Sequence, residues 1–219
     1  MKKIVAISDT HNRLPSILDS IPSGDILIHS GDHTGTGSVE SWANAMSQLN
    51  LISNKFKHIV IIAGNHDRGA EKNPELFNAI CEQLGIIYLC DEEVVLDGIR
   101  IYGSPYTPKF FNWAFMLDGE EAARTKWAAI PEGLDILVTH GPPYGYGDIL
   151  AENGSHPGES VGCSELKLAV GRSKPKFHIF GHIHEGYGKY QLGKSTLINA
   201  AICNEYYQPI NKPQVFYVD

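Results

Sequence analysis

Short apolar runs recur along the chain, and each is followed by polar residues. The runs cover residues 4–7, 26–28, 59–63, 86–89, 136–138 and 177–180. Continuous apolar runs of this length are typical of strands that are buried on both faces of a sheet. The pattern therefore predicts a sheet that is covered on both sides.

Two segments between these runs have the signals of helices. In residues 39–52, apolar residues recur at spacings of three and four, and Ser38 stands where it can cap the first turn. The second segment starts with Asn73 as a candidate cap and Pro74 at the first helical position, and Gly85 marks its end. Strands and helices therefore alternate along the chain.

The turn signal Asp97-Gly98 separates two further apolar segments and predicts a β-hairpin, so part of the sheet is expected to be antiparallel. We therefore expect an α/β fold with mixed strands, in one central sheet or in two stacked sheets. The sequence shows no internal repeat and no interdomain linker, which favours a single domain over residues 1–219. Two loop-rich segments, residues 103–117 and 141–162, either line a site or only decorate the surface.

The charge balance and the cysteines exclude several kinds of protein. Lys and Arg total 18 against 25 Asp and Glu, and no block of basic residues is present, so binding to long nucleic acids is not expected. The four cysteines are far apart and fit neither a zinc knuckle nor a disulfide scaffold. With no signal peptide and no run of about 18 apolar residues, we expect a soluble cytoplasmic protein that does not enter a membrane.

The polar residues that directly follow the predicted strands are of the types that bind metals. In open α/β sheets, ligands bind beyond the carboxyl ends of the strands, where residues far apart in sequence come together. Histidines gather in these turns, together with aspartates and one asparagine. The segments are Asp9-Thr10-His11, Gly31-Asp32-His33, Gly64-Asn65-His66-Asp67, His140-Gly141 and Gly181-His182-Ile183-His184.

Each segment also has a simpler interpretation. Asp9 alone fits a helix cap beside a surface histidine, and Asp32 alone fits a turn residue. The four residues 64–67 form a rarer string, and the spacing of His182 and His184 points both imidazoles the same way in extended backbone. Because the segments occur in order and each follows a predicted strand, we interpret them jointly as a metal site.

This ordered set of segments resembles the calcineurin-like metallophosphoesterases, from residue 4 to about residue 200. Residues 139–148, 180–188 and 199–201 narrow the resemblance to the metallophosphoesterase-domain-containing subgroup of vertebrate brain. Some members of that subgroup lack the first histidine of the Gly-His-Ile-His motif, but here His182 is present. One departure is at His33 and the residues after it, where many relatives carry a second acidic residue and then Arg-Gly. The resemblance implies a four-layer α/β/β/α sandwich of mixed sheets, with a metal site at the carboxyl ends of the strands.

The resemblance also implies two divalent metal ions per chain. Mixed carboxylate, amide and imidazole ligands independently suit borderline ions, and we expect Mn²⁺ ahead of Fe²⁺, Zn²⁺, Co²⁺ and Ni²⁺. Only a carboxylate readily bridges two cations, which fits a shared Asp32. By resemblance, the first ion would take Asp9, His11, Asp32 and His184, and the second would share Asp32 and add Asn65, His140 and His182.

The implied reaction is in-line attack on phosphorus by a hydroxide that bridges the two ions, without a phosphoenzyme. The leaving alkoxide then needs a proton, and His66 is the expected general acid, with Asp67 orienting its imidazole. Candidate contacts to the substrate are Asn65, Arg68, His33 and Tyr144. Tyr144, Tyr146, Phe110, Phe111 and Trp113 are either platforms for a nucleobase or packing residues of their loops, and Arg68 is either a phosphate clamp or a surface residue.

These residues predict a dinuclear metal-dependent phosphodiesterase for small phosphate diesters. The subgroup resemblance makes 2′,3′- and 3′,5′-cyclic nucleotides the leading substrates. A phosphomonoesterase or a nucleotide pyrophosphatase would use the same ligands, so both stay open. The alternative from another class is a non-catalytic protein that senses a nucleotide or acts as a scaffold, but every ligand position and His66 are present here. The sequence does not indicate the oligomeric state.

Overall fold

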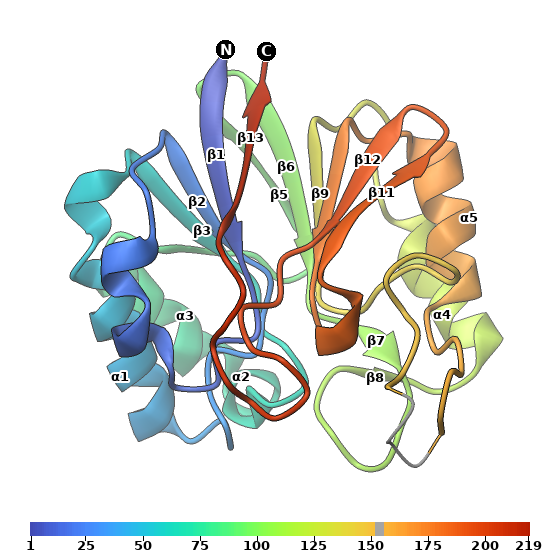
Figure 1. Cartoon of the computed structure of the whole chain (residues 1–219), viewed down its shortest axis with the longest axis horizontal. Helices are drawn as coiled ribbons and strands as arrows, with labels where there is room; N and C mark the ends of the chain where they lie inside the picture. Colours follow the sequence, from blue (N-terminus) through green and yellow to red (C-terminus); the bar gives the residue numbers. More distant parts are fainter. Residues whose placement is uncertain (152–155) are drawn as a thin grey trace.

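Two β-sheets lie face to face at the centre of the molecule, between two groups of helices (Figure 1). The computed structural model describes residues 1–151 and 156–219. The two termini lie side by side because β1 (Lys2–Ile7) and β13 (Gln214–Val218) pair antiparallel, with Lys2 opposite Val218.

The first sheet has five strands in the order β13-β1-β2-β3-β4. Its further strands are β2 (Ile26–His29), β3 (His58–Ile61) and β4 (Ile87–Tyr88). β1 to β4 are parallel, in a register that places Ile4 beside Ile26, and β13 is antiparallel at the edge. The carboxyl ends of β1, β2 and β3 therefore lie at the same end of the sheet.

The second sheet has six strands in the order β11-β12-β10-β9-β6-β5. Its inner strands β6, β9, β10 and β12 are parallel, and β5 and β11 are antiparallel at the two edges. β7 (Thr107–Pro108) and β8 (Met116–Leu117) form a separate short pair. The strands of the second sheet are β5 (Glu92–Leu96), β6 (Ile99–Ser104), β9 (Ile136–Thr139), β10 (Phe177–Phe180), β11 (Gly188–Leu192) and β12 (Ser195–Asn199).

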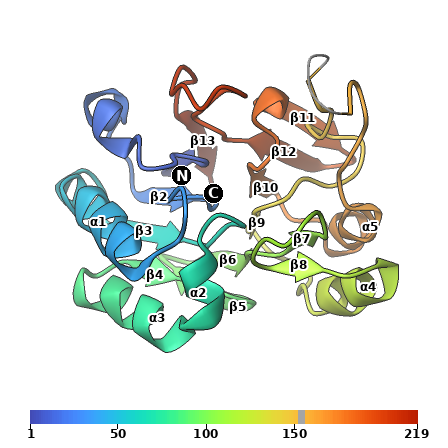
Figure 2. The ribbon, with the colours of Figure 1, turned by 90° about the horizontal axis from the view of Figure 1, so that it is seen from below.

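Helices cover the outer face of each sheet (Figure 2). α1 (Val39–Asn50) and α3 (Pro74–Gln83) lie beside the first sheet, and α4 (Glu120–Ala128) and α5 (Ser164–Ser173) lie beside the second. α2 (Arg68–Lys72) follows the turn after β3. Short 3₁₀ helices are found at Leu14–Ser16, Leu18–Ser20, Ser53–Lys55 and His184–Gly186.

Three apolar layers separate these elements. Val5 packs with Trp42 of α1 in the layer outside the first sheet, whereas its neighbour Ile4 belongs to the layer between the two sheets. Trp127 and Leu166 belong to the third layer, outside the second sheet. Burial of each large apolar side chain stabilises the fold by about 1.5–3 kcal/mol. The four-layer α/β/β/α sandwich of mixed sheets is thus confirmed.

The six apolar runs form strands as predicted, and the hairpin is confirmed between β5 and β6. Asp97 and Gly98 both have positive φ, 52° and 87°, as a type I′ turn requires. Ser38 Oγ accepts the N–H of Ser41 at 3.1 Å at the start of α1. α3 begins at Pro74, but the side chain of Asn73 makes no capping hydrogen bond. Within the described ranges, no helix is both long and apolar enough to cross a membrane.

Candidate metal centre and its pocket

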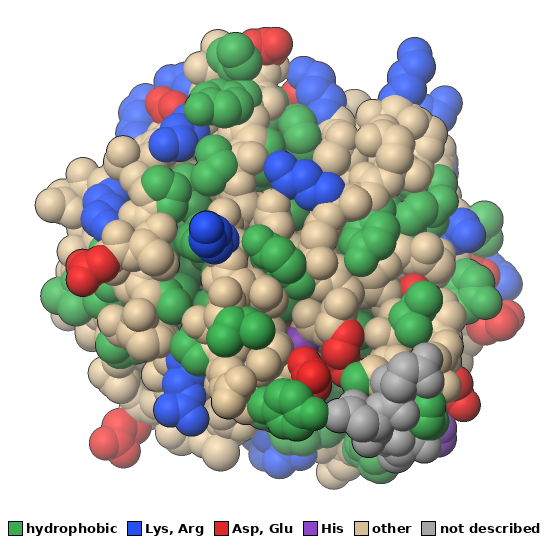
Figure 3. All heavy atoms as spheres, viewed as in Figure 1, with side chains coloured by type: hydrophobic (Ala, Val, Ile, Leu, Met, Phe, Trp, Pro, Cys, Tyr) green, Lys and Arg blue, Asp and Glu red, His purple; other side chains and the backbone are tan. Residues whose placement is uncertain are grey.

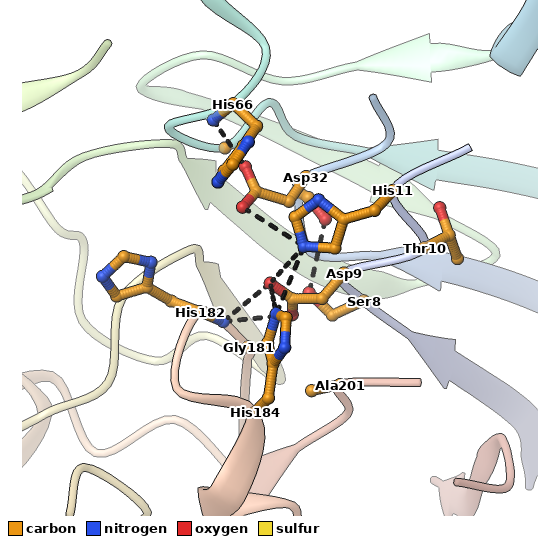
Figure 4. A network of polar contacts seen from close by, with 12 residues as sticks. Ser8, Asp9, Thr10, His11, Asp32, His66, Gly181, His182, His184 and Ala201 are labelled. Carbon is orange, nitrogen blue, oxygen red and sulfur yellow. Dashed lines mark hydrogen bonds and ion pairs between the residues drawn. The ribbon is translucent and has the colours of Figure 1, made fainter. Parts of the chain in front are cut away.

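Strands from both sheets end at the same place, and the candidate metal ligands follow them (Figure 4). The two sheets are joined here, because Ser8 after β1 pairs with Ala201 after β12. The main chain also links β9 to β10, since Gly181 N–H donates to the carbonyl oxygen of His140 at 3.0 Å. The structure brings together all the predicted ligands, Asp9, His11, Asp32, Asn65, His140, His182 and His184.

Asp9, His11 and His184 form the first group of candidate ligands, whose ligand atoms all lie within 4.8 Å of one another. Nε2 of His11 is 3.2 Å from Nε2 of His184, and Nε2 of His184 is 3.4 Å from Oδ1 of Asp9. All three side chains are almost completely buried. Two imidazole nitrogens and a carboxylate oxygen gathered around one point suit a borderline divalent ion.

Asp32, His140 and His182 form the second group, again with ligand atoms within 4.8 Å of one another. Asn65 belongs beside this group, because its Oδ1 is 2.9 Å from Nε2 of His140. An amide oxygen is a suitable ligand for such an ion, so Asn65 can complete the second group.

The carboxylate of Asp32 lies between the two groups. Its Oδ2 is 3.8 Å from Nε2 of His11 and 3.4 Å from Nε2 of His140. Its Oδ1 accepts the backbone N–H of His66 at 2.8 Å, which holds the carboxylate in this orientation. The geometry is that of a carboxylate able to bridge two ions.

Backbone carbonyls orient the imidazoles. Nδ1–H of His11 donates to Thr34, and Nδ1–H of His140 donates to Ser30, at 3.3 and 3.0 Å. His184 makes the same kind of hydrogen bond, to Asn204 at 2.8 Å. A histidine held in this way presents the lone pair of Nε2 to a metal. The donor set, its carbonyl partners and its shared carboxylate therefore fit two divalent ions.

Several of these residues have backbone conformations that non-glycine residues rarely adopt. Asp9, Asp32 and His182 have φ of 53°, 55° and 67°, and His11 has φ of 41°. Left-handed conformations of this kind cost about 1–3 kcal/mol each and concentrate at functional sites. Gly181 is required for a different reason, because a Cβ there would lie 1.9 Å from Oδ2 of Asp9.

The carboxylates and imidazoles change one another's protonation. Burial acts to raise the pKa of Asp9, but the hydrogen bond and the charge of His184 lower it to about 2. Burial likewise opposes protonation of His140 and His184, yet the neighbouring Asp32 and Asp9 raise the pKa of each imidazole to about 9. For His182 burial dominates and lowers the pKa to about 3. Ligand imidazoles must lose these protons when an ion binds, so binding of a cation is coupled to proton release.

His66 lies directly beside the two groups. Its Nδ1–H donates to the carbonyl oxygen of Gly35 at 2.9 Å, and its ring contacts the ring of His11 edge-on, with centroids 4.8 Å apart. Its ligand atom also lies within 4.8 Å of those of His11 and Asp32. With Nδ1 engaged, Nε2 is the atom of His66 that is free to exchange a proton with a bound molecule.

The expected role of Asp67 in orienting His66 is wrong. The buried carboxylate of Asp67 accepts hydrogen bonds from the backbone N–H groups of His33, Thr34 and Gly64, at 3.2, 3.0 and 2.9 Å. It also accepts the hydroxyl of Thr34 at 2.9 Å. Asp67 therefore fixes the loop after β2 against the turn after β3, and the carbonyl of Gly35 orients the imidazole of His66 instead.

Three of the candidate substrate contacts point elsewhere. His33 is buried, stacks on His29 with centroids 3.7 Å apart, and has its Nε2 2.9 Å from the carbonyl oxygen of Ile62. The guanidinium of Arg68 packs on the indole of Trp113 and donates to the carbonyl of Asn112. Tyr144 is exposed, near Lys167 and outside the pocket. Of these four candidates, only Asn65 lines the pocket.

A pocket of about 780 Å³ opens from the metal ligands. Phe110, Phe111 and Trp113 line it from the segment 103–117, and Glu159 and Val161 from the described part of 141–162, so both loop-rich segments contribute. Residues 152–155 of the second segment lie outside the described residues. Figure 3 shows acidic side chains beside the hollow in which a histidine is visible.

Sequence reasoning missed three residues of this pocket, Tyr207, Glu185 and Glu205. The ring of Tyr207 lies 4.8 Å from that of His11 and 5.4 Å from that of His184, at a φ of 58°. No apolar periodicity or motif marks this C-terminal loop, and a left-handed tyrosine has no signature in the sequence. Glu185 could have been suspected because it directly follows His184.

Comparisons with known proteins show what the chain is similar to. The family model of the calcineurin-like phosphoesterases matches residues 2–186. Metallophosphoesterase domain-containing protein 1 of Homo sapiens is 39% identical over 235 residues, covering 97% of this chain and 70% of the relative. A UPF0046 protein of Caenorhabditis elegans is 37% identical, covering 98% and 80%. A solved protein of Thermus thermophilus shares the fold, with a TM-score of 0.63 at 13% identity over 90% of this chain and 88% of that one.

Proposed function

Because the chain belongs to the calcineurin-like phosphoesterase family, we propose that it is a dinuclear metal-dependent phosphodiesterase for small phosphate diesters. The observation that carries this proposal is the placement of Asp32 between two groups of ligands, with His66 beside them in the lining of a pocket. The same features disfavour a non-catalytic scaffold, since neither a ligand nor a candidate general acid is missing.

Two divalent ions, with Mn²⁺ as our first choice, would neutralise charge on the phosphoryl oxygens and lower the pKa of an attacking water. Asp9, His11 and His184 would hold one ion, and His140, His182 and Asn65 the other, with Asp32 shared. The carbonyl partners of the imidazoles keep the ligand atoms in place before a substrate arrives, which reduces the reorganisation needed during the reaction.

His66 is the proposed general acid. Its Nδ1 is engaged by Gly35, and its Nε2 is left for the leaving oxygen of a substrate whose phosphate lies on the ligand groups. Alkoxides are poor leaving groups, and general-acid catalysis contributes typically about 10²–10⁴-fold. His66 therefore matters most for substrates with unactivated leaving groups.

The pocket supports a small substrate with an aromatic or apolar group next to the phosphate. Phe110, Phe111 and Tyr207 offer ring surfaces beside the ligands, and Glu185 and Glu205 disfavour a second anionic group there. On the face seen in Figure 3, Lys and Arg side chains are scattered rather than joined in a band. We therefore propose 2′,3′- or 3′,5′-cyclic nucleotides as substrates, and not long nucleic acids.

The compartment proposed for this activity is the reducing cytoplasm. The four cysteines, Cys81, Cys90, Cys163 and Cys203, are all free thiols.

The test compares hydrolysis of bis-p-nitrophenyl phosphate, a diester, with that of p-nitrophenyl phosphate, a monoester. Metal-stripped protein is assayed with and without Mn²⁺, and cyclic nucleotides follow. We expect hydrolysis that depends on Mn²⁺ and prefers the diester. Preference for the monoester would instead establish a phosphatase, and no hydrolysis of either compound with any divalent ion would favour a nucleotide-sensing protein.

A further inference from the structure

We propose that Trp113 is a positioning residue for His66, an inference that rests on the proposed role of His66 as general acid. The indole of Trp113 packs on the imidazole, with ring centroids 4.3 Å apart and an interplanar angle of 33°. This is a face contact between a candidate acid and a side chain from a distant loop, and nothing in the family's metal-binding motifs contains it.

The hydrogen bond to Gly35 alone does not fix the His66 ring. A single hydrogen bond at Nδ1, 2.9 Å long, restrains the imidazole but still tolerates limited rotation about the Cα–Cβ and Cβ–Cγ bonds, because hydrogen bonds accept angles well away from linear. His11 meets the ring edge-on, at an interplanar angle of 81°. A contact on the face of the ring, from Trp113, opposes the remaining rotation and keeps Nε2 directed toward the ligand groups.

The loop that carries Trp113 is fastened to the segment that carries His66. Ala114 N–H donates to the carbonyl of Asn65 at 3.3 Å, and Phe115 N–H donates to Oε1 of Glu71 at 2.8 Å. Arg68 Nη2 donates to the carbonyl of Asn112 at 2.6 Å. The main chain on both sides of Trp113 is thus bonded to residues 65–71, so the indole and the imidazole keep their relative position.

Arg68 also packs on the indole of Trp113. Its guanidinium carbon lies 4.5 Å from the centre of the indole of Trp113. The indole is therefore already stacked by two groups of the protein, and it is not a free platform for a nucleobase as the sequence alone allowed. Phe110, Phe111 and Tyr207 remain available for that purpose.

The test uses the acidity of the leaving group, which separates proton donation from binding. Bis-p-nitrophenyl phosphate releases nitrophenolate, which needs little protonation, whereas diphenyl phosphate releases phenolate, which needs more. We compare kcat/KM on both diesters, with Mn²⁺, for the wild type, W113L, W113F and H66A. Metal content and thermal unfolding are measured for each variant, so that loss of the fold or of the ions is recognised.

We expect W113L to lose about tenfold or more on diphenyl phosphate relative to bis-p-nitrophenyl phosphate, because small misplacements of a catalytic group cost up to about 10²-fold. H66A should change this ratio in the same direction, and W113F should restore most of it, since a phenyl ring can still pack on the imidazole. The matched control is N112A, a side-chain change at the exposed position next to Trp113 and outside the residues that line the pocket, which should leave the ratio unchanged.

Two results would overturn the inference, and they can be told apart. If H66A changes the ratio but W113L does not, Trp113 does not position the acid and the proposed function stands. If H66A leaves the ratio unchanged, His66 is not the general acid, and the role of Trp113 falls with it.

Discussion

At the scale of single residues, hydrogen bonds to the main chain orient the side chains of the site. The turn after β3 holds the carboxylate of Asp32, which lies after β2, because the backbone N–H of His66 donates to Oδ1 of Asp32. The imidazole of His66 is then directed by Gly35, not by a carboxylate. The acid and the shared ligand are thus set by the main chain of neighbouring turns.

Replacement of His66 by alanine should depress turnover on a diester with an unactivated leaving group by about 10²-fold or more, since general-acid catalysis is lost. The bound metal should stay near the wild-type amount, because His66 is needed for proton transfer and the ligand groups are complete without it. Steady-state rates and metal analysis of the same preparation check both statements. Loss of metal together with activity would show that His66 is a ligand.

Sequence reasoning finds the metal-binding residues because they occur as short strings directly after apolar strands. It fails for the direction of Asp67, since a carboxylate adjacent to His66 in sequence reaches the loop after β2 in space. It also cannot distinguish a pocket histidine from the buried His33, because both occur in the same kind of turn. Side-chain direction depends on turn conformation, and left-handed residues such as Asp32 make that conformation hard to foresee.

At the scale of elements, the parallel strands explain why ligands from distant segments meet. β9 and β10 are paired neighbours in the second sheet and deliver His140 and His182 to the site. Beneath the site they are linked by a buried polar contact, in which Thr139 Oγ1 and His178 Nε2 are 2.8 Å apart. His178 is fully buried, and burial lowers its pKa to about 3.

This buried histidine predicts acid sensitivity of the second sheet. A pKa that folding lowers from 6.5 to about 3 means that the unfolded chain binds the proton more tightly, so stability present above pH 6.5 is lost as the pH falls toward 3. From pH 7 to pH 4 this loss should be about 3 kcal/mol. H178Q should remove that part of the pH dependence, measured by urea unfolding of metal-stripped protein.

The matched control is H156Q, which replaces an exposed histidine. The free energy of unfolding of H156Q should follow the wild type over the same pH range. An unchanged pH dependence in H178Q would contradict the account of the buried histidine.

The elements themselves are largely predictable. Buried parallel strands appear in the sequence as uninterrupted apolar runs. The turn between β5 and β6 contains Asp-Gly, a residue pair that strongly favours a two-residue hairpin turn. β11 and β13 are less predictable. They are edge strands with one exposed face, and the alternation of apolar and polar residues along such strands is weak, as in Gly188–Leu192. The short pair β7 and β8 lies in a segment that the sequence presents only as a loop.

At the scale of the whole molecule, the candidate metal centre joins the two sheets. Asp9, Asp32 and Asn65 come from the first sheet, and His140, His182 and His184 come from the second. Metal bound here would therefore connect the halves of the sandwich. The sequence indicates where the strands end, but it does not indicate which sheet each strand joins. Strand pairing within a sheet depends on contacts between residues far apart in the chain.

Mn²⁺ should therefore stabilise the folded chain as a whole. An ion at about 100 times its dissociation constant adds about 2.7 kcal/mol, which corresponds to a rise in Tm on the order of 5–10 °C for a protein of this size. Thermal unfolding of stripped protein with and without Mn²⁺ measures this rise. H140A should lose most of it, whereas H156Q should keep it; an unchanged Tm in the wild type would argue against ion binding in the native state.

The central claim is tested most directly by titrating metal-stripped protein with Mn²⁺ while following hydrolysis of bis-p-nitrophenyl phosphate and the ions bound per chain. We predict that activity rises until two ions are bound and is abolished in D32N, which should not hold both ions because a neutral amide bridges two cations poorly. Full activity in the presence of a chelator, or two tightly bound ions in D32N, would contradict the dinuclear centre shared by Asp32.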